Sequence, residues 1–251
     1  MEKTAKTEFS KSQLDRLGER LRSDLLSAED LRLLDDYRRS FSEGYEHVVK
    51  IIRDELELEP TGRPAKSTTS IRDKLKRESI RLSQMQDIAG CRIVVPDLMA
   101  QDAAIKSLIS KLGDLKIFDR RLKPSNGYRA VHLIAYCSDR YVEIQVRSAL
   151  QHMWAELSEK FADIIDPALK YGKGPDLWQE TLLRASQTIG TEERTHSRLR
   201  ELKSKASSLP NLPPNLVEDI RRVDAEIAAG TVQLRGMLEQ VIADISKYEG
   251  R

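Results

Sequence analysis

The chain has 251 residues, which is room for one or two domains. Its 42 Lys and Arg residues nearly balance its 40 Asp and Glu residues, and this excludes a protein that binds partners through an overall excess of one charge. Charged residues make up 33% of the chain and aromatic residues 5%, a composition typical of helix-rich domains rather than of a large β-sandwich.

The two cysteines, Cys91 and Cys137, lie far apart in the chain. This spacing argues against a disulfide framework or a cysteine-based zinc site and favours the reducing cytoplasm. Apolar stretches fall well short of the ~18 residues that a transmembrane helix needs, and the first residues lack the apolar core of a secretory signal. We therefore expect a cytoplasmic chain without a membrane span, in which both cysteines are small buried residues.

The first predicted elements are helices over residues 12–57. Ser27 followed by Asp30 is a capping-box pattern, which predicts that a helix starts there. Apolar residues then recur at steps of three and four over residues 31–52, so we expect one long helix with a single apolar stripe. Proline and glycine at 60–64 end this pattern.

After a short basic helix at 70–79, the chain changes to short apolar runs that predict a small sheet. The predicted strands are 91–95, 116–122, 128–136 and 141–146, with a helix over 100–112 between the first two. A turn is expected at 124–127, and a tight turn at Ser138 and Asp139 makes the last two strands antiparallel neighbours.

Side chains alternate along the last predicted strand. Val142, Ile144 and Val146 share one face, which we expect to be core. The other face then carries four side chains with polar groups: Tyr141, Glu143, Gln145 and Arg147. Such a row is either an exposed sheet face or the floor of a cleft.

The last third of the chain predicts helices only. The first covers 148–166 and includes Met153 and Trp154 as core residues, and two long helices follow at about 176–207 and 215–247. Prolines between the long helices forbid a continuous helix and predict a hairpin. The expected fold is therefore α+β, a small mixed sheet flanked by N- and C-terminal helices. The expected organisation is N-terminal helices at 1–59, a core at 60–168 and a helical hairpin at 169–251.

Local charge points to a ligand. Residues 61–92 contain eight Lys or Arg against three acids, and residues 116–147 contain seven against three. Two basic segments beside one sheet suit a phosphate-rich ligand, although on charge alone a solvated surface explains them as well. The common phosphate-binding glycine loops are absent from the sequence, and the four histidines show no metal-ligand spacing.

Two of the acids in these basic segments are candidates for a shared site. Asp87 precedes the first predicted strand, and Glu143 lies on the polar face of the last one. Two carboxylates from different elements beside an arginine-rich cleft can hold Mg²⁺ under a nucleoside triphosphate. Taken singly, each acid is explained as well by a structural role, as a helix cap or as half of a salt bridge.

Four sequence blocks occur in order: GRPAKSTTSIRDKL (62–75), MQDIAGCRIVV (85–95), NGYRAVHLIAY (126–136) and VEIQVRSALQHMWAELSE (142–159). Together they resemble the synthetase domain of the RelA/SpoT family over about residues 60–160. The resemblance implies a fold of the polymerase-β-like nucleotidyltransferase type. It also implies a pyrophosphokinase that transfers the β,γ-pyrophosphate of ATP to the 3′-hydroxyl of GDP or GTP, which makes (p)ppGpp and releases AMP.

The resemblance also assigns roles to residues of the donor side. Asp87 would bind the catalytic Mg²⁺, and Glu143 would share the metal or help to deprotonate the acceptor hydroxyl. Arg63 and Arg92 would sandwich the adenine of ATP, because guanidinium planes stack well on aromatic faces. The triphosphate would be held by Lys66, Ser70 and Lys74.

On the acceptor side, Tyr128 would stack on the acceptor base. The remaining acceptor contacts implied are Lys123, Asn126, Arg129, His132 and Gln145. The basic run that contains Arg120, Arg121 and Lys123 would grip the acceptor's phosphates or extend to an RNA backbone. Read without the family, Tyr128 is a turn aromatic, and His132 with Glu143 is a cross-strand pair without a catalytic task.

Four alternatives stay open at this point. The same set of catalytic residues serves short toxic relatives that modify the 3′ end of tRNA, and others that modify adenosine nucleotides. A different class of function is a non-enzymatic interaction module, in which the C-terminal helices dock a second copy or an antitoxin partner. The same helices could instead neutralise or gate a toxic catalytic domain.

Overall fold

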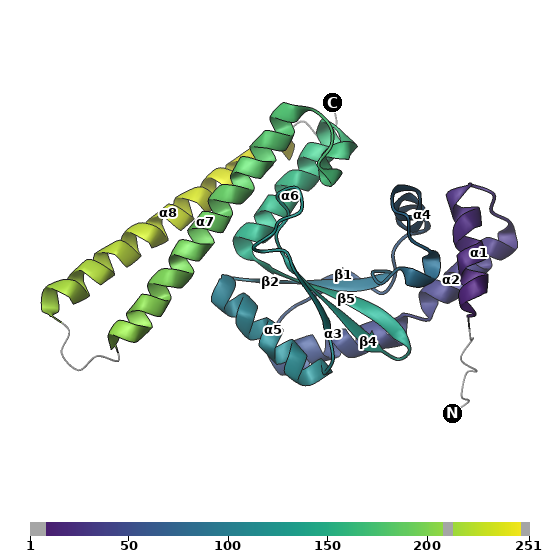
Figure 1. Ribbon diagram of the computed structural model, residues 1–251, viewed down its shortest axis with the longest axis horizontal. Helices are drawn as coiled ribbons and strands as arrows, with labels where there is room; N and C mark the ends of the chain where they lie inside the picture. Colours follow the sequence, from purple (N-terminus) through teal and green to yellow (C-terminus); the bar gives the residue numbers. More distant parts are fainter. Residues whose placement is uncertain (1–8, 208–212, 247–251) are drawn as a thin grey trace. The chain divides into compact units, whose positions relative to one another are not determined.

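The computed structural model describes residues 9–207 and 213–246. It contains helices around a five-stranded sheet (Figure 1). The helices are α1 (Lys11–Arg22), α2 (Ala28–Arg39), α3 (Ser42–Leu56), α4 (Thr68–Arg77), α5 (Leu98–Leu112), α6 (Ala149–Ile164), α7 (Asp176–Ser207) and α8 (Pro214–Ser246), with 3₁₀ turns η1 (Leu82–Gln84) and η2 (Pro167–Tyr171). The strands are β1 (Thr61–Arg63), β2 (Ala89–Val95), β3 (Lys116–Asp119), β4 (Val131–Cys137) and β5 (Arg140–Ser148).

The predicted α+β class, with a small mixed sheet flanked by helices, is confirmed. The strand order is β1-β2-β5-β4-β3, and β1 pairs antiparallel with β2. β4 and β5 are neighbours joined by Ser138 and Asp139, both with positive φ, as a two-residue hairpin turn requires. Val142, Ile144 and Val146 of β5 are fully buried, as their alternation predicts.

The predicted helices at 70–79, 100–112 and 148–166 correspond to α4, α5 and α6 within a few residues. The two long predicted helices correspond to α7 and α8, but the predicted end at 247 lies outside the described residues, as does most of the proline-containing break. Met153 and Trp154 are core residues, as expected.

Three expectations about elements were wrong. The single long helix is interrupted between α2 and α3, where the Ser40 hydroxyl donates to the Tyr37 carbonyl at 2.6 Å and Phe41 turns into the core. The strand expected over 116–122 ends at Asp119, whose carboxylate accepts from the Arg121 amide at 2.9 Å and so forms a local turn. β1 was not expected at all, because it is three residues long and exposed.

The described chain forms two compact units. The first consists of residues 9–93, 104–118 and 132–146, and the second of residues 94–103, 119–131 and 147–246 without 208–212. The N-terminal helices and most of the sheet belong to the first unit. Helices α6, α7 and α8 belong to the second.

In the first unit, helix caps and close packing fix the N-terminal helices. The predicted capping box is present: Ser27 accepts from the Asp30 amide, and the Asp30 carboxylate accepts from the Ser27 amide. Ser67 caps α4 in the same way, by accepting from the Ser70 amide at 3.1 Å. Ile71 and Leu75 of α4 are buried, so its opposite side is free to carry polar groups.

In the second unit, α7 and α8 run side by side, and α6 packs against both (Figure 1). The cluster between them includes Trp154 and Phe161 of α6, Ile189 of α7 and Leu238 of α8. The indole Nε1 of Trp154 donates to the Leu182 carbonyl at 2.7 Å, which satisfies its buried donor and fixes α6 against α7. No helix within the described ranges is both long enough and apolar enough to span a bilayer.

Candidate functional site

A cavity of about 310 Å³ lies in the first unit, over β1, β2 and β5. It gathers five of the residues to which the family resemblance assigns roles on the donor side and in catalysis. The lining residues are Thr61, Gly62, Arg63, Lys66, Asp87, Ile88, Gly90, Cys91, Arg92, Glu143 and Gln145. The two acids, which lie 56 positions apart in the sequence, therefore share one cavity.

The pairing of β1 with β2 places the two arginines. Arg63 lies opposite Gly90, and Arg92 lies opposite Thr61. Directly paired residues of an antiparallel ladder point to the same face, and so do residues two apart on one strand. Arg63 and Arg92 therefore stand diagonally on one face of the sheet, at the rim of the cavity, as a pair of planes that can enclose an aromatic ring.

Asp87 lies just before β2 and is held by two lysines. The amines of Lys66 and Lys74 both contact Asp87 Oδ2, Lys74 at 2.7 Å. Burial raises the pKa of the Asp87 carboxyl, but Lys74 and Lys66 outweigh burial, so that its pKa lies below the usual value. Asp87 is therefore ionised at neutral pH and forms ion pairs with both lysines.

Glu143 projects from the face of β5 opposite its buried valines, as the alternation predicts. Its carboxylate is bonded at 2.8 Å to His132 Nδ1 on β4 and accepts from Gln145 Nε2 at 2.8 Å. Burial raises the pKa of Glu143, but the bond to His132 and the smaller contributions of the histidine charge and of Gln145 outweigh it, so that the net pKa is lowered. The negative charge of Asp87 acts on Glu143 in the opposite direction, as expected for two acids that share one cavity.

The donor atoms fit a hard divalent cation. Oδ1 of Asp87 is buried and has no hydrogen-bond partner in the described part of the chain, although Oδ2 has two. Carboxylate oxygens are the ligands that Mg²⁺ prefers, and it commonly takes one or two of them together with water and substrate phosphates. No group of three or more His, Cys, Asp or Glu side chains with metal-binding geometry occurs among the described residues, so a site here would need ligands from the nucleotide.

Gly90 lets β2 and β5 lie close together beside this centre. A side chain on Gly90 would begin 3.0 Å from the Glu143 carbonyl oxygen and 3.3 Å from Glu143 Cβ. Glycine at this position therefore lets β2 pass close to the base of the Glu143 side chain. No pattern in the sequence predicted a role for this residue, although the Ala-Gly pair before the apolar run was visible.

The remaining donor-side prediction concerns Ser70. It lies in the first turn of α4, one turn before Lys74, and its hydroxyl oxygen is 2.9 Å from that of Ser67. Lys74 reaches Asp87 from this helix, but Ser70 is not among the residues that line the cavity.

The predicted acceptor residues divide between the units. His132 and Gln145 belong to the first unit, where both contact Glu143. Asn126, Tyr128 and Arg129 belong to a loop of the second unit, and Lys123 is an exposed residue of the same segment. We call residues 125–129 the acceptor loop.

The acceptor loop is an ordered turn. Ser125 and Tyr128 exchange backbone hydrogen bonds of 2.9 and 3.2 Å, and Asn126 and Gly127 both have positive φ, as the Asn-Gly sequence predicts. The Tyr128 hydroxyl accepts from Arg147 Nη2 at 3.0 Å, and the Arg147 guanidinium lies 5.1 Å from the centre of the ring. The sequence placed Arg147 on the polar face of the last strand but did not link it to Tyr128.

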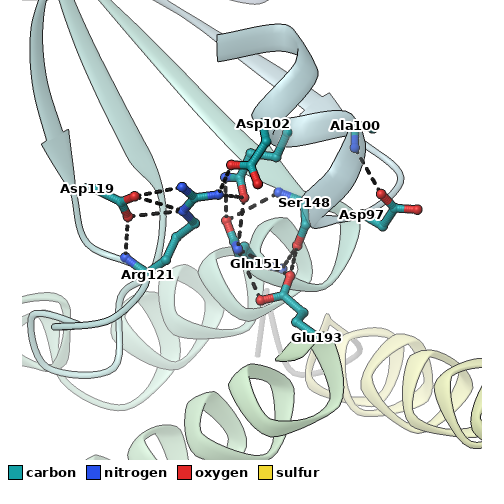
Figure 2. A network of polar contacts seen from close by, with 9 residues as sticks. Asp97, Ala100, Asp102, Asp119, Arg121, Ser148, Gln151 and Glu193 are labelled. Carbon is teal, nitrogen blue, oxygen red and sulfur yellow. Dashed lines mark hydrogen bonds and ion pairs between the residues drawn. The ribbon is translucent and has the colours of Figure 1, made fainter. Parts of the chain in front are cut away.

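Arg121 of the predicted phosphate-binding run is held by acids of its own unit. It pairs with Asp102 at 2.6 Å and with Asp119 at 2.7 Å (Figure 2). These ion pairs make Arg121 part of the structure that supports the loop. The expectation that it grips acceptor phosphates therefore has no support from its contacts.

A larger cavity, of about 490 Å³, lies in the second unit between the start of α6, α7 and α8. Its charged groups are engaged with neighbouring side chains, as in Arg200 with Asp97 at 2.6 Å and His196 with Thr231 at 2.6 Å. The cavity of about 310 Å³ is instead lined by two acids and by two arginines that lie on one face of the sheet. One of these acids, Asp87, has a buried oxygen without a hydrogen-bond partner among the described residues. The smaller cavity is therefore the better candidate for chemistry.

The fold is that of the small alarmone synthetases. The structure of small alarmone synthetase 2 from Bacillus subtilis superposes with a TM-score of 0.53 and 24% identity, covering 68% of this chain and 98% of that one. Small alarmone synthetase 1 from Bacillus subtilis, in a structure bound to its product pppGpp, gives a TM-score of 0.50 and 25% identity over 70% of this chain and 98% of that one.

Residues 62–162 match the family model described as a region found in RelA / SpoT proteins. This part of the chain, less than half of it, is therefore similar to the region found in RelA and SpoT proteins, as the four sequence blocks predicted. A protein of Mycobacterium tuberculosis strain H37Rv and one of Mycobacterium bovis, both described as uncharacterized, are 36% identical to it over 116 residues, which is 45% of this chain and 42% of each relative. The match thus spans less than half the length of these curated relatives.

Proposed function

We propose that this protein is an ATP-dependent pyrophosphokinase that transfers the β,γ-pyrophosphate of ATP to the 3′-hydroxyl of GDP or GTP. The observation that carries the proposal is the convergence of Asp87 and Glu143 on one cavity rimmed by Arg63 and Arg92. The family match and the similarity to a synthetase crystallised with pppGpp support the same reaction.

On the donor side, the adenine of ATP enters between the guanidinium planes of Arg63 and Arg92. Lys66 and Lys74 pair with the β- and γ-phosphates, and Asp87 orients both lysines through the contacts that it makes in the structure. Ser70, at the start of the helix that carries Lys74, is the third proposed contact to the triphosphate. Little covalent work is required of the protein, because positioning and charge neutralisation dominate phosphoryl-type transfer.

Asp87 and Glu143 are the proposed ligands of Mg²⁺. When bound, the ion supplies positive charge that offsets the charge developing on the transferred group. Asp87 offers its unpaired Oδ1, and Glu143 is ionised at neutral pH because its pKa is lowered. The bond from His132 keeps the Glu143 carboxylate oriented within the cavity.

In the transfer step, the 3′-oxygen of the acceptor forms a bond to the β-phosphorus of ATP. The bond between the β-phosphorus and the oxygen that bridges it to the α-phosphate breaks, and AMP leaves with that oxygen. Glu143 accepts a hydrogen bond from the attacking hydroxyl and receives its proton as the new bond forms. The acceptor base stacks on Tyr128, and Lys123, Asn126, Arg129, His132 and Gln145 are its proposed polar contacts.

The test is to incubate the protein with ATP labelled at the γ-phosphate and to offer GDP, GTP, ATP or tRNA as acceptor. We expect label to move to GDP or GTP with AMP released in equal amount. We expect Asp87→Ala and Glu143→Ala to abolish both products, since losing a charge-stabilising contact costs about 10³-fold or more. Near-normal turnover in both variants would refute the site. Transfer of label only to tRNA, or only to the 3′-hydroxyl of an adenosine nucleotide, would refute the guanine-nucleotide acceptor.

A further inference from the structure

One side of helix α7 faces the acceptor loop and the start of α6. Ser186, Gly190 and Glu193 are spaced by four and three residues and so lie on one face of the helix. Ser186 is 1% exposed and Glu193 is 8% exposed, which is unusual for polar side chains on a long helix. Residue 186 lies outside the stretch 62–162 that matches the family model.

Ser186 holds the acceptor loop at two points. Its hydroxyl donates to the carbonyl of Gly127 at 2.5 Å, in the centre of the loop turn. The same hydroxyl oxygen accepts from Arg129 Nε at 3.0 Å, and the Ser186 carbonyl is 3.2 Å from that nitrogen. One side chain of α7 therefore links the residues on both sides of Tyr128.

The loop packs against α7 and α6 too closely for ordinary side chains at two glycines, Gly190 of α7 and Gly127 of the loop. A Cβ on Gly190 would lie 2.6 Å from Arg129 Cζ, and one on Gly127 would lie 2.7 Å from Trp154 Cζ2. The guanidinium of Arg129 thus rests on α7 itself, and its Nη1 donates to the Arg121 carbonyl. Burial lowers the pKa of Arg129, which is consistent with an arginine that is partly withdrawn from solvent.

Two helical turns after Ser186, Glu193 fixes the start of α6. Its carboxylate accepts from the hydroxyl of Ser148, the capping residue of α6, and from Gln151 Nε2 at 3.1 and 3.2 Å (Figure 2). Arg147, which contacts the Tyr128 ring, directly precedes that cap. The polar face of α7 therefore supports Tyr128 from two directions, through the loop and through the segment that carries Arg147.

We propose that α7 is the element that positions the acceptor loop, with Ser186 as the positioning residue that sets the orientation of Tyr128 for the nucleotide base. This inference rests on the proposed function, because it assigns the loop to acceptor binding. Ser186 touches no reacting group and acts through Gly127 and Arg129. Its loss should weaken acceptor binding and leave the donor side unchanged.

The test compares Ser186→Ala with Thr188→Ala in the full chain. Thr188 is exposed on the same helix, and its hydroxyl donates to the carbonyl of Arg184 one turn earlier at 3.1 Å, so its variant controls for a lost hydroxyl on α7. In Ser186→Ala we expect the KM for GDP or GTP to rise about tenfold, because the net contribution of about one hydrogen bond to acceptor binding is lost. The KM for ATP should stay unchanged. Thr188→Ala should match the unmodified protein in both constants.

A second readout does not depend on activity. The amide of Tyr128 donates to the Ser125 carbonyl at 2.9 Å, so its hydrogen exchange reports on the loop turn. Exchange at this amide should accelerate about tenfold in Ser186→Ala and stay unchanged in Thr188→Ala. Gly190→Ala, which displaces Arg129 without removing the hydroxyl, should give the same pattern as Ser186→Ala.

The outcomes separate the two proposals. If the unmodified chain transfers pyrophosphate to no acceptor but exchange accelerates in Ser186→Ala, the proposed function fails and the support of the loop by α7 stands. If transfer occurs but Ser186→Ala changes neither the acceptor KM nor the exchange of Tyr128, the role of α7 is refuted. An equal rise in the KM of ATP and acceptor would also refute it, because that result indicates general loss of structure.

Discussion

Replacing Asp87 by asparagine removes one charge and keeps the shape of the side chain. Asp87 is the shared partner of Lys66 and Lys74, and the three side chains are 14%, 21% and 20% exposed. Removing one partner of a fully buried ion pair costs about 3–5 kcal/mol. Because both lysines retain some access to water, we expect Asp87→Asn to lower the free energy of unfolding by about 1–3 kcal/mol.

The pH dependence of this loss has a definite sign. The folded-state pKa of Asp87 is lowered, so its contribution is complete above the unfolded-state pKa of about 4 and disappears as the pH falls through the folded-state value. Urea denaturation at pH 7 should therefore separate Asp87→Asn from the unmodified protein, and the difference should shrink below pH 4. Pyrophosphate transfer should fall about 10³-fold, since the group that orients two phosphate-binding lysines loses its charge.

Asp24 provides the matched control. It also pairs with two basic residues of α4, Arg72 and Lys76, but at an exposed position. Exposed pairs contribute little, so Asp24→Asn should leave transfer unchanged and unfold at nearly the same urea concentration. If Asp87→Asn retains transfer within threefold of the unmodified protein, or if Asp24→Asn loses as much, the reasoning about the cavity is wrong.

Three further predictions concern stability and reactivity. Burial raises the pKa of Glu193, so this acid destabilises the folded chain increasingly as the pH rises above about 4.5. Glu193→Gln should therefore flatten the dependence of the unfolding free energy on pH between about 4.5 and 7. An unchanged slope would contradict this prediction. Burial and the neighbouring Glu143 raise the pKa of Cys91 to about 12, which leaves about 10³-fold less thiolate at pH 8 than an ordinary thiol has. Cys137 is only half-buried, contrary to the expectation that both cysteines are buried, so iodoacetamide should label Cys137 well before Cys91; equal rates in the native protein would refute the burial of Cys91. Gly127→Ala combines a positive φ of 86° with a clash against Trp154 and should cost about 1–3 kcal/mol in urea denaturation, whereas the exposed Gly113→Ala, which strains φ without a clash, should cost less.

Local sequence signals predicted the elements that local interactions stabilise. The capping box at Ser27 and Asp30 and the alternation around Val142 and Ile144 depend on residues that are neighbours in the chain. The Asn-Gly turn of the acceptor loop was likewise visible, because positive φ at two successive residues favours this dipeptide. For the candidate site, the motif blocks brought Asp87 and Glu143 to attention, and both line the cavity.

The features that were missed depend on partners distant in sequence. β1 exists because Thr61–Arg63 pairs with β2. Three exposed residues show no alternating pattern from which a strand could be predicted. The break before α3 carries no proline or glycine and is set by the burial of Phe41. The contacts of Ser186 with the acceptor loop span nearly sixty residues, so no pattern within α7 indicates them.

The shortness of β1 has a consequence for nucleotide binding at this cavity. Three exposed residues at the end of the strand order gain little from their own burial, yet they carry Arg63. If adenine binds between Arg63 and Arg92, binding of the nucleotide and pairing of β1 with β2 are coupled in one equilibrium. Local unfolding of β1 should then become less frequent as the ATP concentration rises, by mass action. Occupancy of the cavity and pairing of β1 with β2 would therefore change together.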